Sequence, residues 1–291
     1  MNKIAQALRQ TRALYIGDGK DQWDFGHIQQ RFGLCAQHVE AGEFLARVAA
    51  YPEPEVAAEL AGWRRSFAEV IEPSESDLMK ATRVYCVLRD LLREHRATSL
   101  ALCCGSLIRD DWDLAPCLSF ARLLDEGITC ACEGDVNSLL SMLLLSTASG
   151  GPAIMGNVRV LPPQTPKAGL RLAIEHCILP LSMTDSAGYI LRDHHGHGRG
   201  VTGYALIRTG VSATVVQMDD ALSRISIFDG NILEGGEGTC CRIGLRIAIE
   251  HPSRPPLELM HRHASLVLGR WAEPISVTAT ELGLRTQEVS G

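Results

Sequence analysis

The sequence predicts an α/β protein in two parts: a Rossmann-like domain with a parallel sheet over residues 1–150, then a β-rich, antiparallel and barrel-like domain over residues 151–291. Two observations predict this division. In the first part, short apolar runs alternate with helix-like segments, which is typical of a parallel sheet with crossover helices. After Gly150-Gly151-Pro152, strand patterns follow one another and are separated by glycine and proline.

Helices and strands alternate through the first part of the chain. The clearest helix is expected over residues 74–95, where Ser74 and Asp77 have the spacing of a capping box and leucines recur at helical intervals. The other strands are expected at residues 13–17, 34–39, 99–104 and up to Cys132, and the other helices at about 115–124 and 136–148.

The second part offers a series of strand candidates and one hairpin signal. Asp229-Gly230 has the composition of a tight turn between two strands. Proline-rich segments at residues 162–166 and 254–256 are expected to be loops. The pattern favours an antiparallel sandwich or barrel. The strand candidates cover residues 153–160, 170–177, 201–208, 212–218, 222–228 and 240–249.

Charge and hydropathy narrow the classes of partner. The net charge of −6 and the lack of a long basic run argue against nucleic acid or an anionic membrane surface. The longest apolar stretch, residues 139–145, is far below the roughly 18 residues that span a bilayer. The N-terminus has no hydrophobic signal segment, so a cytoplasmic location without membrane partners is expected.

The ten cysteines are expected to be reduced thiols, because nothing in the sequence indicates export. Cys103-Cys104 and Cys240-Cys241 are adjacent pairs, and a single residue separates Cys130 from Cys132. No two CxxC arms are present, so the spacing does not resemble a zinc motif.

The segment after the strand that ends at Cys132 is the strongest candidate for chemistry. Ligands of open parallel sheets lie beyond the carboxyl ends of the strands, and Glu133 and Asp135 follow such an end. Asp135 is expected to cap the helix that begins at Val136, because its carboxylate can accept the free amides of the first turn. Glu133 is then the carboxylate available to bind a metal or move a proton.

Histidines supply further donors in three places: His176, the loop from His194 to His197, and His261 to His263. Each one alone is explained as a structural or solvated side chain. Together with Glu133 they offer nitrogen and oxygen donors suited to Mn²⁺, Fe²⁺ or Zn²⁺. Arg199, in the same loop as His195, is either a partner for an anionic group of a substrate or an exposed arginine.

Signatures of several enzyme classes are missing. Gly17-Asp18-Gly19 lacks the third glycine of a dinucleotide-binding fingerprint, and the sequence has neither a GxxxxGK[ST] phosphate loop nor a GxSxG elbow. The sequence therefore gives no positive indication of a nicotinamide enzyme, an ATPase or an α/β-hydrolase.

An ordered set of motifs resembles the L-fucose isomerase-like family. The resemblance extends over about residues 75–275, and it depends on the order of the motifs rather than on any one of them. The motifs are Pro116-Cys117 and the segments 124–128, 132–136, 151–159, 176–180, 192–201, 226–234 and 262–264.

The resemblance implies an aldose–ketose isomerase that binds Mn²⁺ through a Glu, an Asp and a His and moves a proton between C1 and C2 through an enediolate. Carried over by position, Glu133 is a metal ligand and catalytic base, and His263 is the last ligand. Asn157 stands where the family has its Asp ligand, and a neutral amide is expected to hold a hard cation less tightly. His176 is either an additional ligand or an outer contact of the site.

Further expectations follow from the same resemblance. Cys132, next to Glu133, and Cys177, next to His176, are either thiolate ligands that favour Fe²⁺ or Zn²⁺, or core residues. The chain is expected to lack the N-terminal α/β domain of the family and to form a homo-oligomer with the site near a subunit interface. Its substrate is expected to be a sugar or a related polyhydroxylated small molecule. The alternatives are another reaction type, such as a lyase, an epimerase or a step of specialised metabolism, or a non-catalytic homologue with a decayed metal site.

Overall fold

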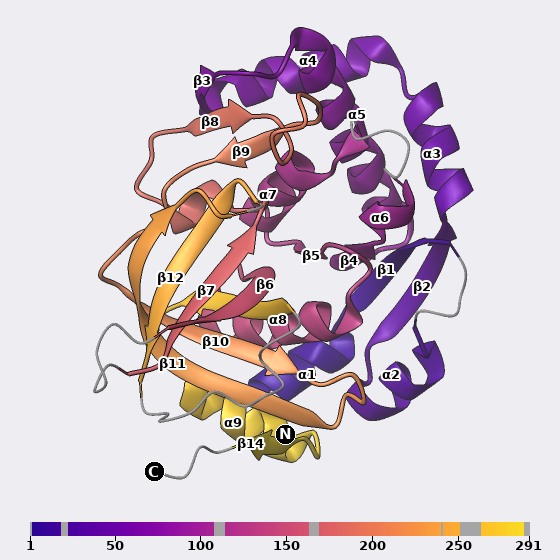
Figure 1. The fold of residues 1–291 in the computed structure, drawn as a ribbon. Helices are drawn as coiled ribbons and strands as arrows, with labels where there is room; N and C mark the ends of the chain where they lie inside the picture. Colours follow the sequence, from indigo (N-terminus) through magenta and orange to yellow (C-terminus); the bar gives the residue numbers. More distant parts are fainter. Residues whose placement is uncertain are drawn as a thin grey trace.

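The computed structural model describes residues 2–18, 23–107, 114–162, 169–239, 241–250 and 263–287. These residues form a four-stranded parallel sheet, a closed antiparallel barrel and a small three-stranded sheet (Figure 1). The predicted fold class, an α/β fold with a parallel sheet followed by a barrel-like β region, is confirmed.

The parallel sheet has the strand order β2-β1-β4-β5. Its central strands are apolar and buried, as expected for strands with helices on both faces. The strands are β1 (Arg12–Gly17), β2 (Cys35–Glu40), β4 (Ser99–Leu102) and β5 (Thr129–Ala131). The strand expected over 99–104 ends earlier, because a short helix begins at Cys104.

Helices accompany this sheet, and the longest begins as the sequence predicts. The side chain of Ser74 accepts a hydrogen bond from the backbone of Asp77, whose carboxylate in turn accepts one from the backbone of Ser74. The helices are α1 (Lys3–Gln10), α2 (Phe25–Phe32), α3 (Ala41–Ala50), α4 (Glu53–Trp63), α5 (Glu75–Glu94), α6 (Cys104–Leu107), α7 (Cys117–Asp125), α8 (Val136–Ser149) and, near the C-terminus, α9 (Ala272–Glu281).

The barrel closes because β10 pairs with both β13 and β11, which completes the ring β10-β13-β6-β7-β12-β11. Strand β14 (Arg285–Gln287) extends the sheet beside β11 in parallel orientation. The barrel strands are β6 (Ile154–Leu161), β7 (Arg171–His176), β10 (Ser212–Met218), β11 (Arg224–Gly236), β12 (Ile243–Ile249) and β13 (His263–Leu268).

The predicted turn at Asp229-Gly230 is wrong, because both residues lie inside the long strand β11. Gly230 serves close strand packing instead, since a Cβ there would lie 2.4 Å from the carbonyl oxygen of Ala248 on β12. The chain turns earlier, where one carboxylate oxygen of Asp219 accepts hydrogen bonds from the amides of Ser223 and Arg224.

A third sheet, which the sequence analysis did not predict, joins the two parts of the chain. Strand β3 (Phe67–Val70) runs parallel to β8 (Tyr189–Arg192), and β8 pairs with β9 (Thr202–Tyr204), so the strand expected over 201–208 is shorter. An ion pair between Arg192 and Glu72, at 2.8 Å, reinforces this connection. The predicted loop at 254–256 lies outside the described residues, as does 162–166 beyond Pro162.

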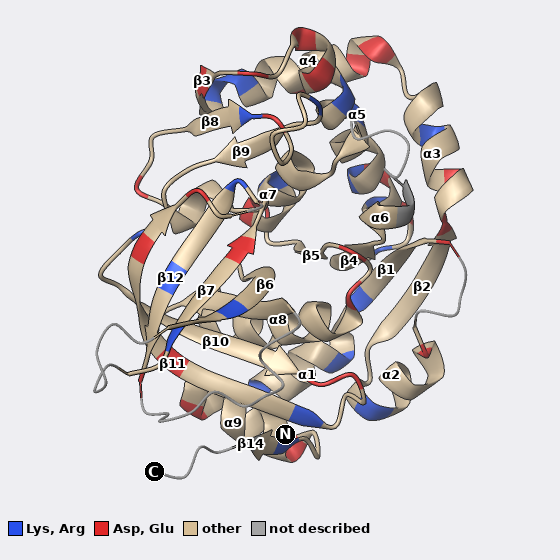
Figure 2. Cartoon of the chain, viewed as in Figure 1, with Lys and Arg blue, Asp and Glu red and all other residues tan. Residues whose placement is uncertain are grey.

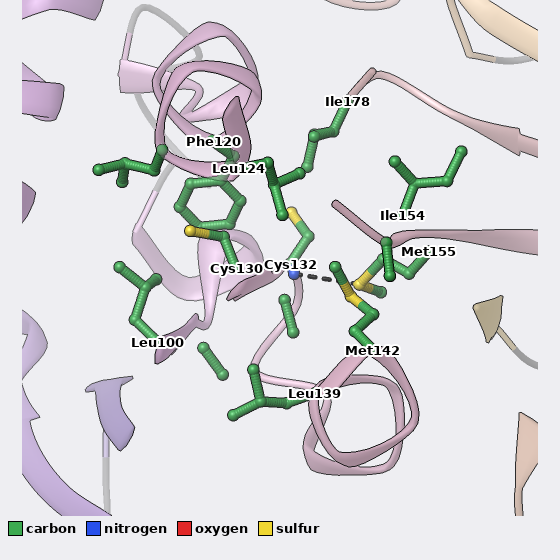
Figure 3. Packing of buried hydrophobic residues seen from close by; sticks show 14 of the residues in the cluster. Leu100, Phe120, Leu124, Cys130, Cys132, Leu139, Met142, Ile154, Met155 and Ile178 are labelled. Atoms are coloured by element: carbon green, nitrogen blue, oxygen red, sulfur yellow. Dashed lines mark hydrogen bonds between the residues drawn. The ribbon is translucent and has the colours of Figure 1, made fainter. Parts of the chain in front are cut away.

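The apolar core is continuous from the parallel sheet to the barrel. Figure 3 shows side chains of α7, α8 and β6 packed around Cys130 and Cys132, which flank Ala131 at the end of β5. The backbone amide of Cys132 donates a hydrogen bond to the sulfur of Met155 on β6, with an N···S distance of 3.2 Å. The turn that follows Cys132 is therefore anchored to the barrel as well as to the parallel sheet.

Helix α8 lies between the two sheets and carries no charged residue (Figure 2). Its residues from Ser138 to Leu145 are all buried, because it packs against β13 and β10 of the barrel and β5 of the parallel sheet. Even this apolar helix is too short to cross a bilayer, and the described residues contain no candidate membrane span.

Candidate metal centre

The turn between β5 and α8 holds Glu133 in a strained backbone conformation. Glu133 has a φ of 58° and Gly134 a φ of 66°, in the left-handed region that non-glycine residues seldom occupy. Two contacts fix the turn: the amide of Gly134 donates to Leu102 O at 3.0 Å, and the indole of Trp23 donates to Gly134 O at 2.8 Å. Such strain persists where the surroundings enforce it, and it is concentrated at functional sites.

This strain predicts an unusual order of stability at residue 133. Glu133→Ala and Glu133→Gly both remove the carboxylate, but only glycine adopts a φ of 58° without steric cost. The glycine variant is expected to have the higher free energy of unfolding, by about 1 kcal/mol. Urea denaturation of the two variants measures the difference. A more stable alanine variant would show that the turn relaxes to another conformation.

His263, the first residue of β13, is held between two carboxylates. Its Nδ1 lies 2.9 Å from Asp135 Oδ2, and its Nε2 lies 3.6 Å from Glu133 Oε2. Asp135 also caps α8 as predicted, accepting a hydrogen bond from the amide of Ser138 at 2.9 Å. Asp135 therefore fixes the imidazole ring and leaves Nε2 directed toward Glu133, the arrangement in which a carboxylate orients a metal-binding histidine.

The charges of this group depend on one another. Burial lowers the pKa of His263, but the carboxylates of Asp135 and Glu133 outweigh it and raise that pKa to about 9. The interaction with His263, across 3.6 Å, in turn keeps the pKa of Glu133 below its ordinary value. Burial opposes ionisation of Asp135, yet the hydrogen bonds from His263 and Ser138 lower its pKa. At neutral pH these shifts favour two ionised carboxylates around an imidazolium.

His176, at the end of β7, completes the group. It is buried, its Nδ1 has no hydrogen-bond partner among the described residues, and its ring centroid lies 5.8 Å from that of His263. Burial, together with the charge of His263, lowers the pKa of His176 to about 3, so its imidazole is neutral and able to coordinate. One ligand atom from each of Glu133, His176 and His263 lies within 4.8 Å of the others. The unpartnered Nδ1 and the mixed nitrogen and oxygen donors fit a divalent metal ion.

Asn157 lies beside this group on β6. The strand register pairs it with His263, and it lines the same cavity as Glu133 and His176. Because directly paired residues of antiparallel strands project to the same side of a sheet, its amide is next to the imidazole of His263. Asn157 is thus near the centre, where it offers a neutral oxygen.

Replacing Asn157 by Asp is expected to tighten Mn²⁺ binding by about tenfold, since an added anionic oxygen increases the affinity for a hard cation. Calorimetric titration of the metal-free protein measures this change. The control is Asn137→Asp, which adds the same charge on α8 at a residue outside the cavity lining. Equal effects of the two substitutions would show that net charge, rather than direct coordination by residue 157, raises the affinity.

The cavity has a volume of about 370 Å³, within the range of small-molecule sites. Among the predicted residues, Cys132 and His195 also line it, whereas Arg199 is exposed and does not. Cys132 is buried, and its sulfur lies 3.0 Å from that of Cys104. The other described residues of the lining are Cys103, Cys104, Gly105, Pro116, Cys117, His194 and Cys241.

Several of these cavity residues were not predicted as site residues. Cys103 and Cys104 directly follow β4, so the rule that singled out Glu133 after β5 also applied to them. Cys117 belongs to the Pro116-Cys117 motif of the family resemblance, whereas Cys241 has no comparable signal, because only the tertiary fold brings the segment before β12 to the cavity. His261, which the sequence analysis considered with His263, lies outside the described residues.

The fold and the site together define an α/β protein with a closed barrel and a candidate metal centre at the wall of a small-molecule cavity. No protein-family model matches the chain. Over 159 residues the chain is 23% identical to a protein named sulfoquinovose isomerase from Alkalicoccus urumqiensis, a match that covers 52% of this chain and 36% of that protein. The chain thus matches about a third of the length of this relative. The similarity supports the resemblance at the level of sugar isomerases and does not single out L-fucose isomerase.

Proposed function

We propose that this chain is a metal-dependent aldose–ketose isomerase acting on a sugar or a related polyhydroxylated small molecule. The observation that carries the proposal is the group of Glu133, His176 and His263, which places a carboxylate and two imidazoles around one point at a cavity. The distant similarity to a protein named sulfoquinovose isomerase supports the same class of reaction.

The metal ion would be held by Glu133, by Nε2 of His263 and by a ring nitrogen of His176, whose Nδ1 has no hydrogen-bond partner within the described part of the chain. Mn²⁺ is the ion that the family resemblance implies, and Fe²⁺ and Zn²⁺ suit the two imidazoles. A bound divalent ion would supply the positive charge that stabilises the negative charge developing on O1 and O2 of the substrate. Asn157 would add a neutral oxygen donor toward the metal or a substrate hydroxyl.

Glu133 is the proposed base. Aldose–ketose isomerisation removes the C2 hydrogen as a proton and returns a proton to C1, while the carbonyl moves from C1 to C2 and the O2 proton passes to O1. Glu133 suits this role because the nearby imidazole of His263 keeps the pKa of its carboxyl low and its side chain is 53% exposed. Asp135 is proposed as a positioning residue, because His263 and Ser138 already hydrogen-bond to its oxygens.

The direct test is turnover of aldoses, including sulfoquinovose, by the full-length protein in D₂O with and without added Mn²⁺. The expected result is a ketose that carries deuterium at C1, formed only with metal and lost in Glu133→Gln. A metal-loaded protein that makes no ketose from any sugar of the panel would contradict the proposal. Deuterium at C2 of an epimer, or elimination of water, would instead identify an epimerase or a lyase.

The quaternary state and location complete the proposal. A homo-oligomer with the cavity near a subunit interface, and a cytoplasmic location, stay predictions from the sequence. Light scattering coupled to size-exclusion chromatography measures the mass in solution, and a monomer that is fully active would contradict a shared site.

A further inference from the structure

A second group of metal-ligating side chains lies beside the cavity. It consists of Cys177, directly after β7, His195 in the loop after β8, and Cys241 shortly before β12. One ligand atom from each residue lies within 4.8 Å of the other two. Both thiols are buried, whereas His195 is exposed. None of the three belongs to the group around Glu133.

The backbone around these residues is fixed by the ion pair between Asp193 and Arg242. Asp193 also accepts hydrogen bonds from the amides of Gly196 and Gly198, which fold the loop so that His195 has a φ of 55°. The backbone amide of Arg242 donates to the sulfur of Cys177 with an N···S distance of 3.4 Å. The ion pair therefore connects the segments that carry all three side chains, so the group is assembled before any ion binds.

The donor atoms define the kind of ion. Two sulfurs and one imidazole nitrogen are soft or borderline ligands, which favour Zn²⁺ over the hard cations Mg²⁺ and Mn²⁺. The thiol of Cys117, in the first turn of α7, is buried and lines the same cavity as His195 and Cys241. Cys117 is not among the residues whose ligand atoms lie within 4.8 Å of one another, so the fourth position is left to water or substrate, as in three-ligand zinc sites.

We propose that Cys177, His195 and Cys241 form a second metal site, selective for Zn²⁺, that fastens the loop of residues 193–200 to the end of the barrel beside the cavity. This site is distinct from the proposed isomerase centre, and it requires neither Glu133 nor His263. The expected protein carries two different ions, a hard one between carboxylate and imidazoles and a soft one between thiols and imidazole.

Cobalt reports on this site directly, because Co²⁺ bound to thiolates gives a charge-transfer absorption in the near ultraviolet and Co²⁺ bound only to carboxylate and imidazoles does not. Titration of the reduced, metal-free, full-length protein is expected to give this absorption at about one Co²⁺ per chain. The absorption should persist in Glu133→Gln and in the control Cys35→Ser, whose thiol is exposed elsewhere. It should be absent in Cys241→Ser. A reduced wild-type protein without the absorption, or an undiminished absorption in Cys241→Ser, would overturn the proposal.

A variant at the exposed ligand avoids the risk that a core substitution prevents folding. His195→Gln is expected to weaken Co²⁺ binding by at least about tenfold, the effect that removing even an outer partner of a metal ligand produces. Hydrogen–deuterium exchange of residues 193–200 should slow when Zn²⁺ is added to the wild type or to Glu133→Gln, and much less in His195→Gln. Exchange that Zn²⁺ leaves unchanged in the wild type, or slows equally in His195→Gln, would show that the loop is not fastened by a metal.

Discussion

Glu133→Gln and His263→Ala are each expected to weaken Mn²⁺ binding by about a hundredfold or more and to abolish metal-dependent isomerisation. The binding free energy of a tight metal site is about 10 kcal/mol or more. Divided among three or four ligands, it corresponds to about 3 kcal/mol for each ligand. Since about 1.4 kcal/mol corresponds to a tenfold change in affinity, loss of one ligand costs about two powers of ten. Glutamine keeps the size of Glu133 but removes its charge, so this variant isolates the contribution of the charge at residue 133 to metal binding.

Calorimetric titration and elemental analysis of the metal-free and reconstituted variants measure this loss. Matched controls are Asp185→Asn, which neutralises an exposed carboxylate paired with Arg208, and His27→Ala on α2. Both controls are expected to bind Mn²⁺ like the wild type. Full metal content in Glu133→Gln and in His263→Ala would refute the centre, while loss in only one of them would redefine its ligands.

Asp135→Asn is expected to weaken Mn²⁺ binding by about ten- to a hundredfold although Asp135 is not proposed as a ligand. Its Oδ2 lies 2.9 Å from Nδ1 of His263 and thereby fixes the ring with Nε2 toward Glu133. A carboxylate in this position also increases the basicity of the coordinating nitrogen, and loss of such partners has effects of this size on metal affinity. Asparagine removes the charge but keeps an oxygen near the imidazole.

The stability of α8 separates this positioning role from a structural one. Asn caps a helix about as well as Asp, so the free energy of unfolding of Asp135→Asn is expected to change by less than about 1 kcal/mol. Ser138→Ala, which removes the hydroxyl that donates to Asp135 at 2.8 Å, serves as the control for local packing. If Asp135→Asn binds Mn²⁺ as tightly as the wild type, then Asp135 only caps the helix and does not position His263.

Local patterns identified the elements whose signals lie within a short stretch of chain. The capping box at Ser74 and Asp77 predicted the start of α5, and Asp135 was recognised as the cap of α8. In both cases a side chain hydrogen-bonds to a backbone amide three residues later, so the sequence contains both partners. Glu133 was found by a similar argument, because a residue directly after a parallel strand lies at the ligand-binding edge of the sheet.

Sequence patterns failed to predict the local structure where that structure depends on a segment far away in the chain. Asp229-Gly230 has the composition of a turn, but Gly230 lies within β11. Glycine is needed there because the carbonyl of Ala248 on the paired strand approaches too closely for a side chain. The small sheet of β3, β8 and β9 was missed because β3 and β8, more than a hundred residues apart, pair only when the chain folds. The strand patterns predicted a β-rich region, and the pairing of β10 with β11 closed it into a barrel.

The sequence by itself determined the α/β fold class, the strand–turn–helix around Glu133 and the capping role of Asp135, because these depend on residues that are neighbours in the chain. Only the tertiary structure decided which histidines join Glu133. It brings His176 and His263 close to Glu133, beside the cavity that Glu133 and His176 line, and it leaves Arg199 exposed outside that cavity. It also gathers Cys177, His195 and Cys241, whose spacing resembles no metal motif. The physical reason is that closing the barrel against α8 brings the ends of distant strands together, and no pattern among neighbouring residues predicts that approach.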